Sequence, residues 1–294
     1  MTNQTASRYR MPAVFGPAPG PRQHPDGRMW RKEETGTMRS DWMRVAYRTD
    51  PAKLERLLPP GFELRGDPVV NVNCAWLRDL YWLAGRSYGI LAINFPATFR
   101  GSEETIAGNF CPVLWEGRPD AIMTGREELG FPKMFADFPE IARDKAAGTA
   151  SCSASYMGFT FFDIALEGLV EEANPVKVLP EAGKSGGPLL YWKYMPRTSP
   201  GGGEGADVSC VTTGAPRGST ATNIIMDDFD YRRWTGKGAV RWHRAKWEQL
   251  PLSAHVVNGI ADLDILEFVD AELVSFSGPG IAISVNQMRT VEAI

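Results

Sequence analysis

The segment Gly125–Met134 carries the strongest chemical signal in this sequence. Phe131 and Pro132 directly precede Lys133, and Met134 follows it. A lysine that only serves solubility lies among polar residues, whereas these neighbours predict a dehydrated ammonium group. Burial disfavours the charged form of a lysine, lowers its pKa and leaves a neutral amine that can attack a carbonyl carbon. Lys133 is therefore a candidate nucleophile. The alternative is a packing lysine whose stem covers the core and whose ammonium reaches water.

Other catalytic patterns in the sequence are weak. The three histidines, His24, His243 and His255, are widely separated, and neither a Gly-x-Ser-x-Gly nor a His-Glu-x-x-His motif occurs. The four cysteines form no Cys-x-x-Cys pair and are interpreted as reduced, mostly buried thiols. The acidic run at 227–230 lacks the glycine that a calcium loop requires, so it is interpreted as a solvated turn. The sequence predicts no metal site.

Composition sets the broad class. The chain has 294 residues, 43% of them hydrophobic and 23% charged, which is typical of a globular protein. A net charge of -3 gives no support for a nucleic-acid partner. The most apolar stretch, residues 88–99, is too short to span a bilayer, so no membrane association is expected. The polar N-terminus lacks the apolar core of a signal peptide, and a cytoplasmic location is the default expectation.

Local patterns then suggest how the chain is organised. Residues 1–30 are rich in Pro, Gly and Arg without periodicity, and they predict a flexible arm or one laid over a partner subunit. Residues 31–294 are expected to form one domain. A short helix should follow Asp50, which can cap it, with Pro51 at the first helical position.

Strand patterns dominate the rest of the sequence. Runs bounded by Gly, Pro and Asp are predicted as strands at 42–48, 68–77, 88–99, 121–124, 149–157, 159–167, 188–195, 239–244 and 263–275. Strands do not alternate regularly with helices, so a parallel doubly wound sheet is not expected. The predicted fold is mainly β, in the α+β class, with one antiparallel curved sheet or barrel-like domain and a few short helices.

The segment around Lys133 resembles a known family. Gly125-Arg126-Glu127 followed by Phe131-Pro132-Lys133 is similar to the lysine motif of the acetoacetate decarboxylase family. Further segments resemble that family in the same order, so the likeness runs from about residue 39 to 276. Acetoacetate decarboxylase is itself an established example of an enzyme with an activated lysine. The resemblance implies a mainly β fold, a homo-oligomer and a lysine that forms an imine with a small oxo acid.

Individual positions carry further implications of the resemblance. Arg39 falls near the family's substrate-binding arginine and is expected to hold a substrate carboxylate. Met134 stands where decarboxylases have a second lysine, and Asn73 and Ile90 stand where they have two glutamates. Asn73 and Met134 are expected to line the pocket, which Phe131 keeps dry. The apparent loss of the glutamates suggests a substrate different from that of the decarboxylases.

Three functions follow from this interpretation. The preferred one is a Schiff-base lyase that acts on a small oxo acid such as pyruvate, by aldol addition with dehydration or the reverse cleavage. No metal or organic cofactor is expected, because the iminium on Lys133 is itself the electron sink. The first alternative is decarboxylation of acetoacetate or another 3-oxo acid, which two glutamates elsewhere in the pocket would favour. The second alternative is a non-catalytic protein of the same fold that binds a small ligand.

Overall fold

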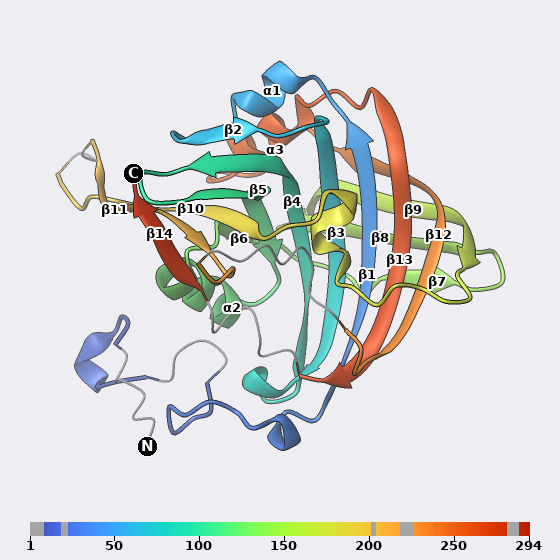
Figure 1. The fold of residues 1–294 in the computed structure, drawn as a ribbon, viewed down its shortest axis with the longest axis horizontal. Helices are drawn as coiled ribbons and strands as arrows, with labels where there is room; N and C mark the ends of the chain where they lie inside the picture. The colour runs from blue at the N-terminus through green and yellow to red at the C-terminus, as the bar shows by residue number, and fades with distance from the viewer. Residues whose placement is uncertain (1–8, 19–22, 201–203, 218–225, 281–287) are drawn as a thin grey trace.

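The computed structural model describes residues 9–18, 23–200, 204–217, 226–280 and 288–294. Strands dominate this part of the chain (Figure 1). They are β1 (Thr37–Arg48), β2 (Phe62–Leu64), β3 (Val69–Leu80), β4 (Arg86–Arg100), β5 (Thr105–Glu116), β6 (Lys133–Phe135), β7 (Ala142–Asp144), β8 (Thr149–Tyr156), β9 (Phe159–Glu171), β10 (Leu189–Pro196), β11 (Ala206–Thr213), β12 (Asp230–Trp242), β13 (Glu267–Pro279) and β14 (Arg289–Ala293).

Helical segments are short. Three are α-helices, α1 (Pro51–Glu55), α2 (Pro119–Thr124) and α3 (Ala254–Ala261). The others are the 3-10 turns η1 (Ala13–Phe15), η2 (Lys32–Glu34), η3 (Tyr81–Leu83) and η5 (Pro180–Ser185), together with the π-helical turn η4 (Gly125–Leu129). In the described residues, no helix is long and apolar enough to cross a membrane.

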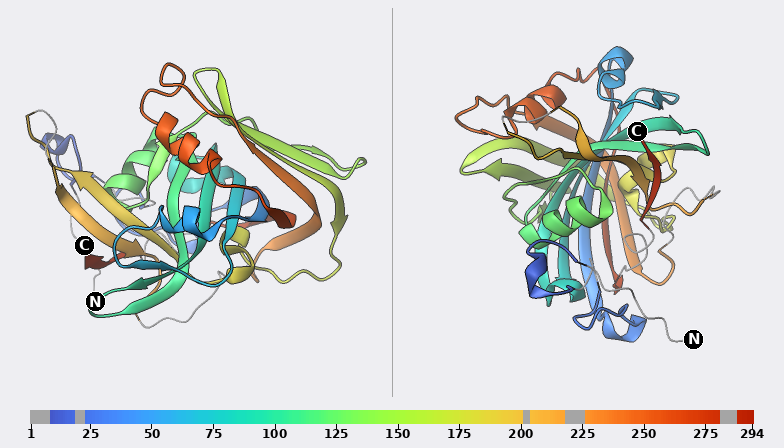
Figure 2. Two further views of the ribbon diagram at one scale, coloured as in Figure 1. Left: turned by 90° about the horizontal axis from the view of Figure 1, so that it is seen from above. Right: turned by 90° about the vertical axis from the view of Figure 1, so that its left-hand side faces the viewer.

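All of the strands belong to a single sheet. Its order is β14-β11-β10-β5-β4-β3-β1-β13-β12-β9-β8-β7, with β2 added beside β4 and β6 beside β5. Neighbours pair antiparallel, except that β5 runs parallel to both β10 and β6. The sheet is strongly curved, and α1 and α3 lie together at its upper end (Figure 2). The prediction of a mainly β fold with an antiparallel curved sheet and few helices is confirmed.

Strand alternation divides the sheet into two faces. On β1, Met43, Val45 and Tyr47 are fully buried in the main hydrophobic core, on what we call the core face. Met38 and Trp42 point the other way and belong to a second, smaller apolar cluster, on what we call the pocket face. Successive side chains of a strand point to opposite faces, so the position of a residue along its strand decides which face it reaches.

The predicted helix after Asp50 is confirmed as α1. The Asp50 Oδ1 atom accepts a hydrogen bond of 2.9 Å from the backbone N–H of Ala52 and so caps the first turn. The strand predicted at 121–124 is wrong, because this segment forms α2. Pro119 stands in its first turn, and a short apolar run does not by itself distinguish a strand from a buried helix.

One segment crosses the pocket face of the sheet. Residues 178–188, here called the strap, contain η5 and contact β1, β3, β4 and β5 (Figure 1). The Tyr231 hydroxyl donates a 2.9 Å hydrogen bond to the Val178 carbonyl at one end. At the other end, the Asn109 backbone N–H donates one of 2.9 Å to the Pro188 carbonyl. The strap therefore forms a second wall above the sheet.

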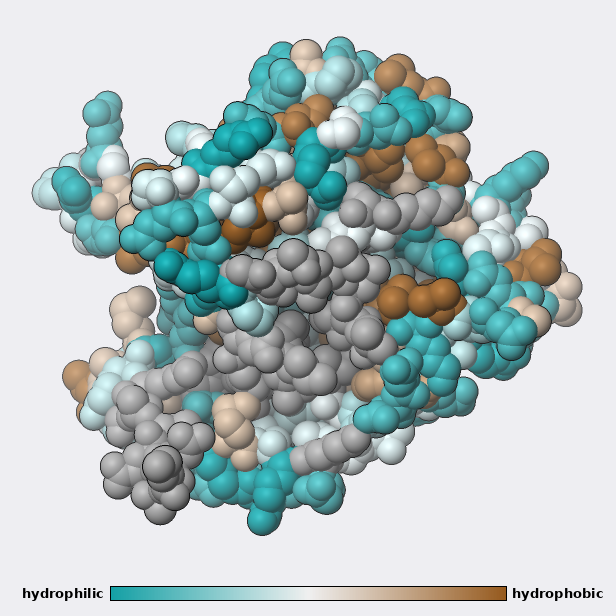
Figure 3. Space-filling model, in the orientation of Figure 1, coloured by the Kyte–Doolittle hydropathy of each residue, from teal (hydrophilic) through white to brown (hydrophobic). Residues whose placement is uncertain are grey.

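The division into an arm of residues 1–30 and a domain of residues 31–294 stays a prediction. Where the arm is described, Arg10 Nη1 lies 3.0 Å from Glu128 Oε1 on η4. The Trp30 ring stands edge-on to Tyr81 of η3, with centroids 5.2 Å apart. On the face drawn in Figure 3, hydrophilic residues predominate and hydrophobic residues form separate small patches.

Candidate active site

Lys133 is the first residue of β6, which pairs parallel to β5 with Lys133 opposite Leu114. The preceding turn η4 ends at Gly130, whose φ of +84° suits glycine. The Arg126 guanidinium donates a 2.7 Å hydrogen bond to the Lys133 carbonyl and ties η4 to β6. The motif thus folds back on itself and leaves Lys133 only 7% exposed on the pocket face.

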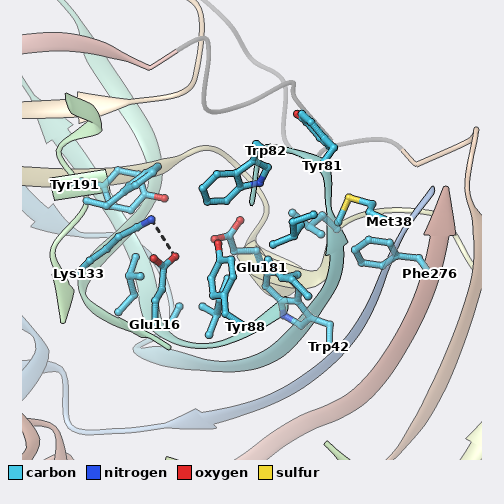
Figure 4. A pocket seen from close by; sticks show the side chains of 17 residues that line it. Met38, Trp42, Tyr81, Trp82, Tyr88, Glu116, Lys133, Glu181, Tyr191 and Phe276 are labelled. Carbon is cyan, nitrogen blue, oxygen red and sulfur yellow. Dashed lines mark ion pairs between the residues drawn. The ribbon is translucent and has the colours of Figure 1, made fainter. Parts of the chain in front are cut away.

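The Lys133 amine lies close to polar groups. Its Nζ lies 2.9 Å from Glu116 Oε1 (Figure 4) and 3.0 Å from the Ala121 carbonyl oxygen, to which it donates a hydrogen bond. The Phe131 ring lies beneath it, with 4.9 Å from Nζ to the centroid. Burial destabilises a charged ammonium, whereas the Glu116 carboxylate stabilises it. The pair can therefore exchange a proton over a short distance.

Glu116 closes β5 and is 3% exposed. Its Oε1 atom faces Lys133, and its buried Oε2 atom has no hydrogen-bond partner among the described residues. A buried carboxylate oxygen without a partner is costly, and such atoms occur where a ligand or catalytic function needs them. Glu116 is not among the residues predicted from the sequence, because Gly108, Asn109 and Pro112 interrupt the β pattern of the strand that carries it.

The cavity in front of Lys133 has a volume of about 140 Å³. One end holds Lys133, Glu116 and Tyr191, and Glu181 of the strap projects into the space between the ends (Figure 4). The opposite end is apolar and is lined by a group that includes Met38, Trp42, Leu77, Leu80 and Phe276. The cavity therefore combines an end that carries ionisable groups with an apolar extension.

Cys111 is a further buried polar group near this end of the cavity. It is fully buried in a small cluster with Ala92, Leu114 and Tyr191, which all line the cavity. Burial raises the pKa of the Cys111 thiol, and the charge of Glu181 raises it further. Cys111 therefore stays a neutral thiol at physiological pH and packs behind the residues that line the cavity, where it is not a competing nucleophile.

The structure brings some of the predicted site residues together and separates others. Lys133 and Phe131 line the cavity, as does Ile90. Asn73 is buried just behind it, where its Oδ1 accepts a 3.0 Å hydrogen bond from the indole of Trp42.

Arg39 and Met134 do not reach the cavity. The Arg39 side chain is 60% exposed and forms an ion pair of 2.7 Å with Asp79, because its neighbour Met38 takes the pocket-facing position. Met134 follows Lys133 in the strand and packs against the main core. Their expected contacts with substrate are not supported by this geometry, since strand alternation turns both away.

Gly125 provides space for the Lys133 side chain. A Cβ atom at Gly125 would lie 2.5 Å from Lys133 Cδ and Cε and 2.6 Å from Nζ. The backbone of Gly125 is helical, with φ −65° and ψ −43°, so glycine is not needed for its conformation. The reason for glycine here is therefore the close approach of the lysine.

We expect Gly125→Ala to lower kcat by about 10²-fold, the cost typical of a displacement of about 1 Å at a reacting group. Tm should also fall, because moving Lys133 weakens its buried ion pair with Glu116, and this loss outweighs the gain of up to ~1 kcal/mol from alanine in a helix. Gly259→Ala in α3 is the matched control, since nothing lies within 4 Å of its added Cβ. Steady-state kinetics and calorimetry measure both effects, and an unchanged kcat in Gly125→Ala would contradict the prediction.

A buried amine paired with a carboxylate at the end of an apolar cavity defines a site in which an amine can add to a carbonyl group. Comparison with known proteins agrees with this class. The family profile described as Acetoacetate decarboxylase (ADC) matches residues 11–278. The chain therefore belongs to the acetoacetate decarboxylase family.

Individual relatives are distant. The acetoacetate decarboxylase of Paraburkholderia phytofirmans is 25% identical over 239 residues, which cover 79% of this chain and 77% of that protein. The acetoacetate decarboxylase of Clostridium botulinum is 26% identical over 125 residues, which are 40% of this chain and 48% of that protein. In this second alignment, the chain spans about half the length of its relative.

Solved structures share the fold. An acetoacetate decarboxylase-like enzyme from Sphingomonas wittichii RW1 superposes with a TM-score of 0.60 at 19% identity, covering 88% of this chain and 93% of that one. The enduracididine biosynthesis enzyme MppR, complexed with pyruvate, superposes with a TM-score of 0.60 at 18% identity, covering 87% and 90%. At these identities, the likeness establishes the acetoacetate decarboxylase-like fold alone.

Proposed function

We propose that this protein is a Schiff-base lyase in which Lys133 forms an imine with a small oxo acid such as pyruvate. The observation that carries the proposal is the buried Lys133 amine, 2.9 Å from Glu116 and facing an apolar cavity. A lysine buried for packing alone would gain nothing from a cavity in front of its amine. The extension of this cavity beyond the lysine leaves room for a second reactant, which favours aldol addition followed by dehydration.

Glu116 has the position required to activate Lys133. Transfer of the Lys133 proton to Glu116 gives a neutral amine and a neutral carboxylic acid. The amine attacks the ketone carbon of the oxo acid, and a proton passes from the attacking nitrogen to the carbonyl oxygen, which becomes a hydroxyl group. Protonation of this hydroxyl by Glu116 lets it leave as water, which gives the iminium. Buried catalytic carboxyls typically contribute 10²–10⁴-fold to such proton transfers.

The iminium then accepts electrons from the adjacent carbon. In the aldol reaction, a carboxylate removes a proton from the methyl group of the pyruvate imine, and we assign this step to Glu181. The resulting enamine attacks the carbonyl carbon of an aldehyde, which gains a proton at oxygen. Glu181 then removes the second proton from the same carbon, and the hydroxyl takes up that proton and leaves as water, which gives an unsaturated imine. Hydrolysis of this imine by water releases the product and Lys133.

Decarboxylation of a 3-oxo acid such as acetoacetate is the second candidate. The sequence suggested that glutamates were lost from the pocket, at Asn73 and Ile90. The cavity nevertheless contains Glu116 and Glu181, carried by other elements. In this reaction, the bond to the carboxylate breaks, CO2 leaves, and its electrons enter the iminium to form an enamine, which a neighbouring acid protonates. The two carboxyl groups that line the cavity with Lys133 therefore favour this candidate.

Borohydride trapping tests the shared step. Incubation with pyruvate or acetoacetate followed by borohydride should reduce the iminium to a stable secondary amine, seen as a mass increase of the intact protein. Peptide mapping should place the adduct on Lys133. Lys145→Met, which removes an exposed lysine, is the control and should trap normally. If no oxo acid gives an adduct, the protein is a ligand-binding member of the fold and the proposal fails.

Product analysis separates the two reactions. If the protein catalyses aldol addition with dehydration, pyruvate with an aldehyde should give an unsaturated product that absorbs in the ultraviolet. If it is a decarboxylase, acetoacetate should give CO2. Release of CO2 from acetoacetate, without condensation of pyruvate with any aldehyde tested, would reverse the order of the two candidates.

A further inference from the structure

Four buried asparagines lie on the pocket face of neighbouring strands. Asn71 and Asn73 belong to β3, Asn94 to β4 and Asn109 to β5, and each is at most 2% exposed. A buried side-chain amide is costly unless its hydrogen bonds are satisfied. Such amides in the middle of a sheet therefore need specific partners, and for Asn73, Asn94 and Asn109 these partners include main-chain carbonyls of the strap.

Two of these amides converge on one atom. Asn94 Nδ2 donates a hydrogen bond of 2.8 Å to the main-chain carbonyl of Glu181, and Asn73 Nδ2 donates one of 3.2 Å to the same oxygen. A carbonyl oxygen has two lone pairs, so both are occupied here. Glu181 is the strap residue whose side chain projects into the cavity.

Donors on the amide oxygens fix the orientation of both groups. The Trp42 indole donates to Asn73 Oδ1 at 3.0 Å, and Asn71 Nδ2 donates to Asn94 Oδ1 at 3.3 Å. An amide whose oxygen accepts from a fixed donor must present its nitrogen to the other side. Both nitrogens are therefore directed at the Glu181 carbonyl.

The chain of contacts continues away from the cavity. Asn71 Oδ1 accepts a hydrogen bond of 3.2 Å from the buried guanidinium of Arg44, whose Nε lies 2.5 Å from Glu272 Oε1. Gly183 of the strap has a φ of +57°, and a Cβ atom there would lie 2.3 Å from Asn71 Oδ1. The strap backbone therefore lies directly on this buried polar network, with no space for a side chain at Gly183.

We propose that Asn73 and Asn94 are positioning residues that clamp the Glu181 carbonyl and thereby fix the Glu181 carboxyl group in the cavity. This inference rests on the proposed function, because it concerns the group assigned there to proton transfer at carbon. The two amides contact the main-chain carbonyl of Glu181 and not its carboxyl group.

A double-mutant cycle tests the clamp. Asn94→Leu keeps the approximate volume and removes the donor. We expect kcat to fall roughly 10- to 100-fold, as for a misplaced catalytic group, with little change in KM or in borohydride trapping. Because Asn94 acts through Glu181, Asn94→Leu combined with Glu181→Gln should be no slower than Glu181→Gln alone. If the losses of the two single variants multiply, Asn94 acts independently and the proposal is overturned.

Asn109→Leu is the matched control for general loosening of the strap. Asn109 Nδ2 donates a 2.6 Å hydrogen bond to the Gly186 carbonyl, five positions beyond Glu181. Asn109→Leu should lower Tm but affect kcat much less than Asn94→Leu. Equal losses of kcat in the two variants would show that Asn94 only helps to hold the strap in place, and the proposal would be overturned.

Hydrogen exchange gives a readout that does not need turnover. The peptide covering residues 178–188 should exchange faster in Asn73→Leu and Asn94→Leu than in wild type, even if no oxo acid is a substrate. Unchanged exchange would refute the clamp, whereas faster exchange without any trapped imine would refute only the proposed function. The two failures are therefore distinguishable.

Discussion

Replacing Lys133 by methionine is expected to abolish borohydride trapping and to lower kcat by at least ~10⁴-fold, the scale of loss seen when a covalent nucleophile is removed. The reason is that the iminium cannot form without the amine, so the electrons left at the adjacent carbon by CO2 or by a proton have no electron sink. Turnover of the best oxo acid and the mass of the borohydride-treated protein are the two measurements.

A stability measurement must accompany this variant. Lys133→Met leaves Glu116 buried without its cation, which typically costs 3–5 kcal/mol of unfolding free energy. Lys133→Met combined with Glu116→Gln should recover most of that stability but none of the activity. Trapping that persists in a folded Lys133→Met protein would place the imine on another residue and overturn the assignment.

The second large effect is expected for Glu116→Gln. We expect kcat to fall 10²–10⁴-fold, the contribution typical of a positioned general acid or base. Imine trapping should persist, because the amine itself is retained and still lies in the cavity. Single-turnover kinetics should show slow formation of the iminium, since no neighbouring acid protonates the departing hydroxyl group.

The pH dependence of borohydride trapping tests whether Glu116 stabilises the ammonium form of Lys133. The wild-type carboxylate favours the ammonium form of Lys133, and glutamine removes that attraction. The neutral amine should therefore form at lower pH, and the midpoint of trapping against pH should move down in Glu116→Gln. Glu127→Gln is the control, because Glu127 lies in the same motif but not in the cavity lining. An upward shift, or an unchanged kcat, would argue against proton exchange within the pair.

Much of the fold was accessible from local sequence patterns. Alternating apolar and polar residues, in runs bounded by Gly, Pro and Asp, predicted most of the strands. Asp50 with Pro51 predicted α1. β5 was not predicted, and Glu116 was not predicted as a site residue because it is the last residue of that strand. Gly108, Asn109 and Pro112 are poor strand residues in isolation, and they are tolerated because β4 pairs along most of the strand. Tertiary pairing here overrides local preference.

Local sequence is enough to predict Lys133 as a candidate nucleophile with apolar neighbours. Phe131, Pro132 and Lys133 are adjacent in the chain, so their proximity needs no long-range information. The glycine at 125 was also visible in the motif, but the reason for it was not. Only the folded chain places the Lys133 side chain within 2.6 Å of the position that a Cβ atom would occupy.

The tertiary structure decided which groups surround that lysine. Glu116 arrives through the parallel pairing of β5 with β6, and Glu181 arrives on a strap held by the amides of Asn73 and Asn94. Strand alternation turns Arg39 away from the cavity, although it was a sequence candidate. These outcomes depend on register and on contacts between distant segments, since a shift of one residue moves a side chain to the opposite face of the sheet.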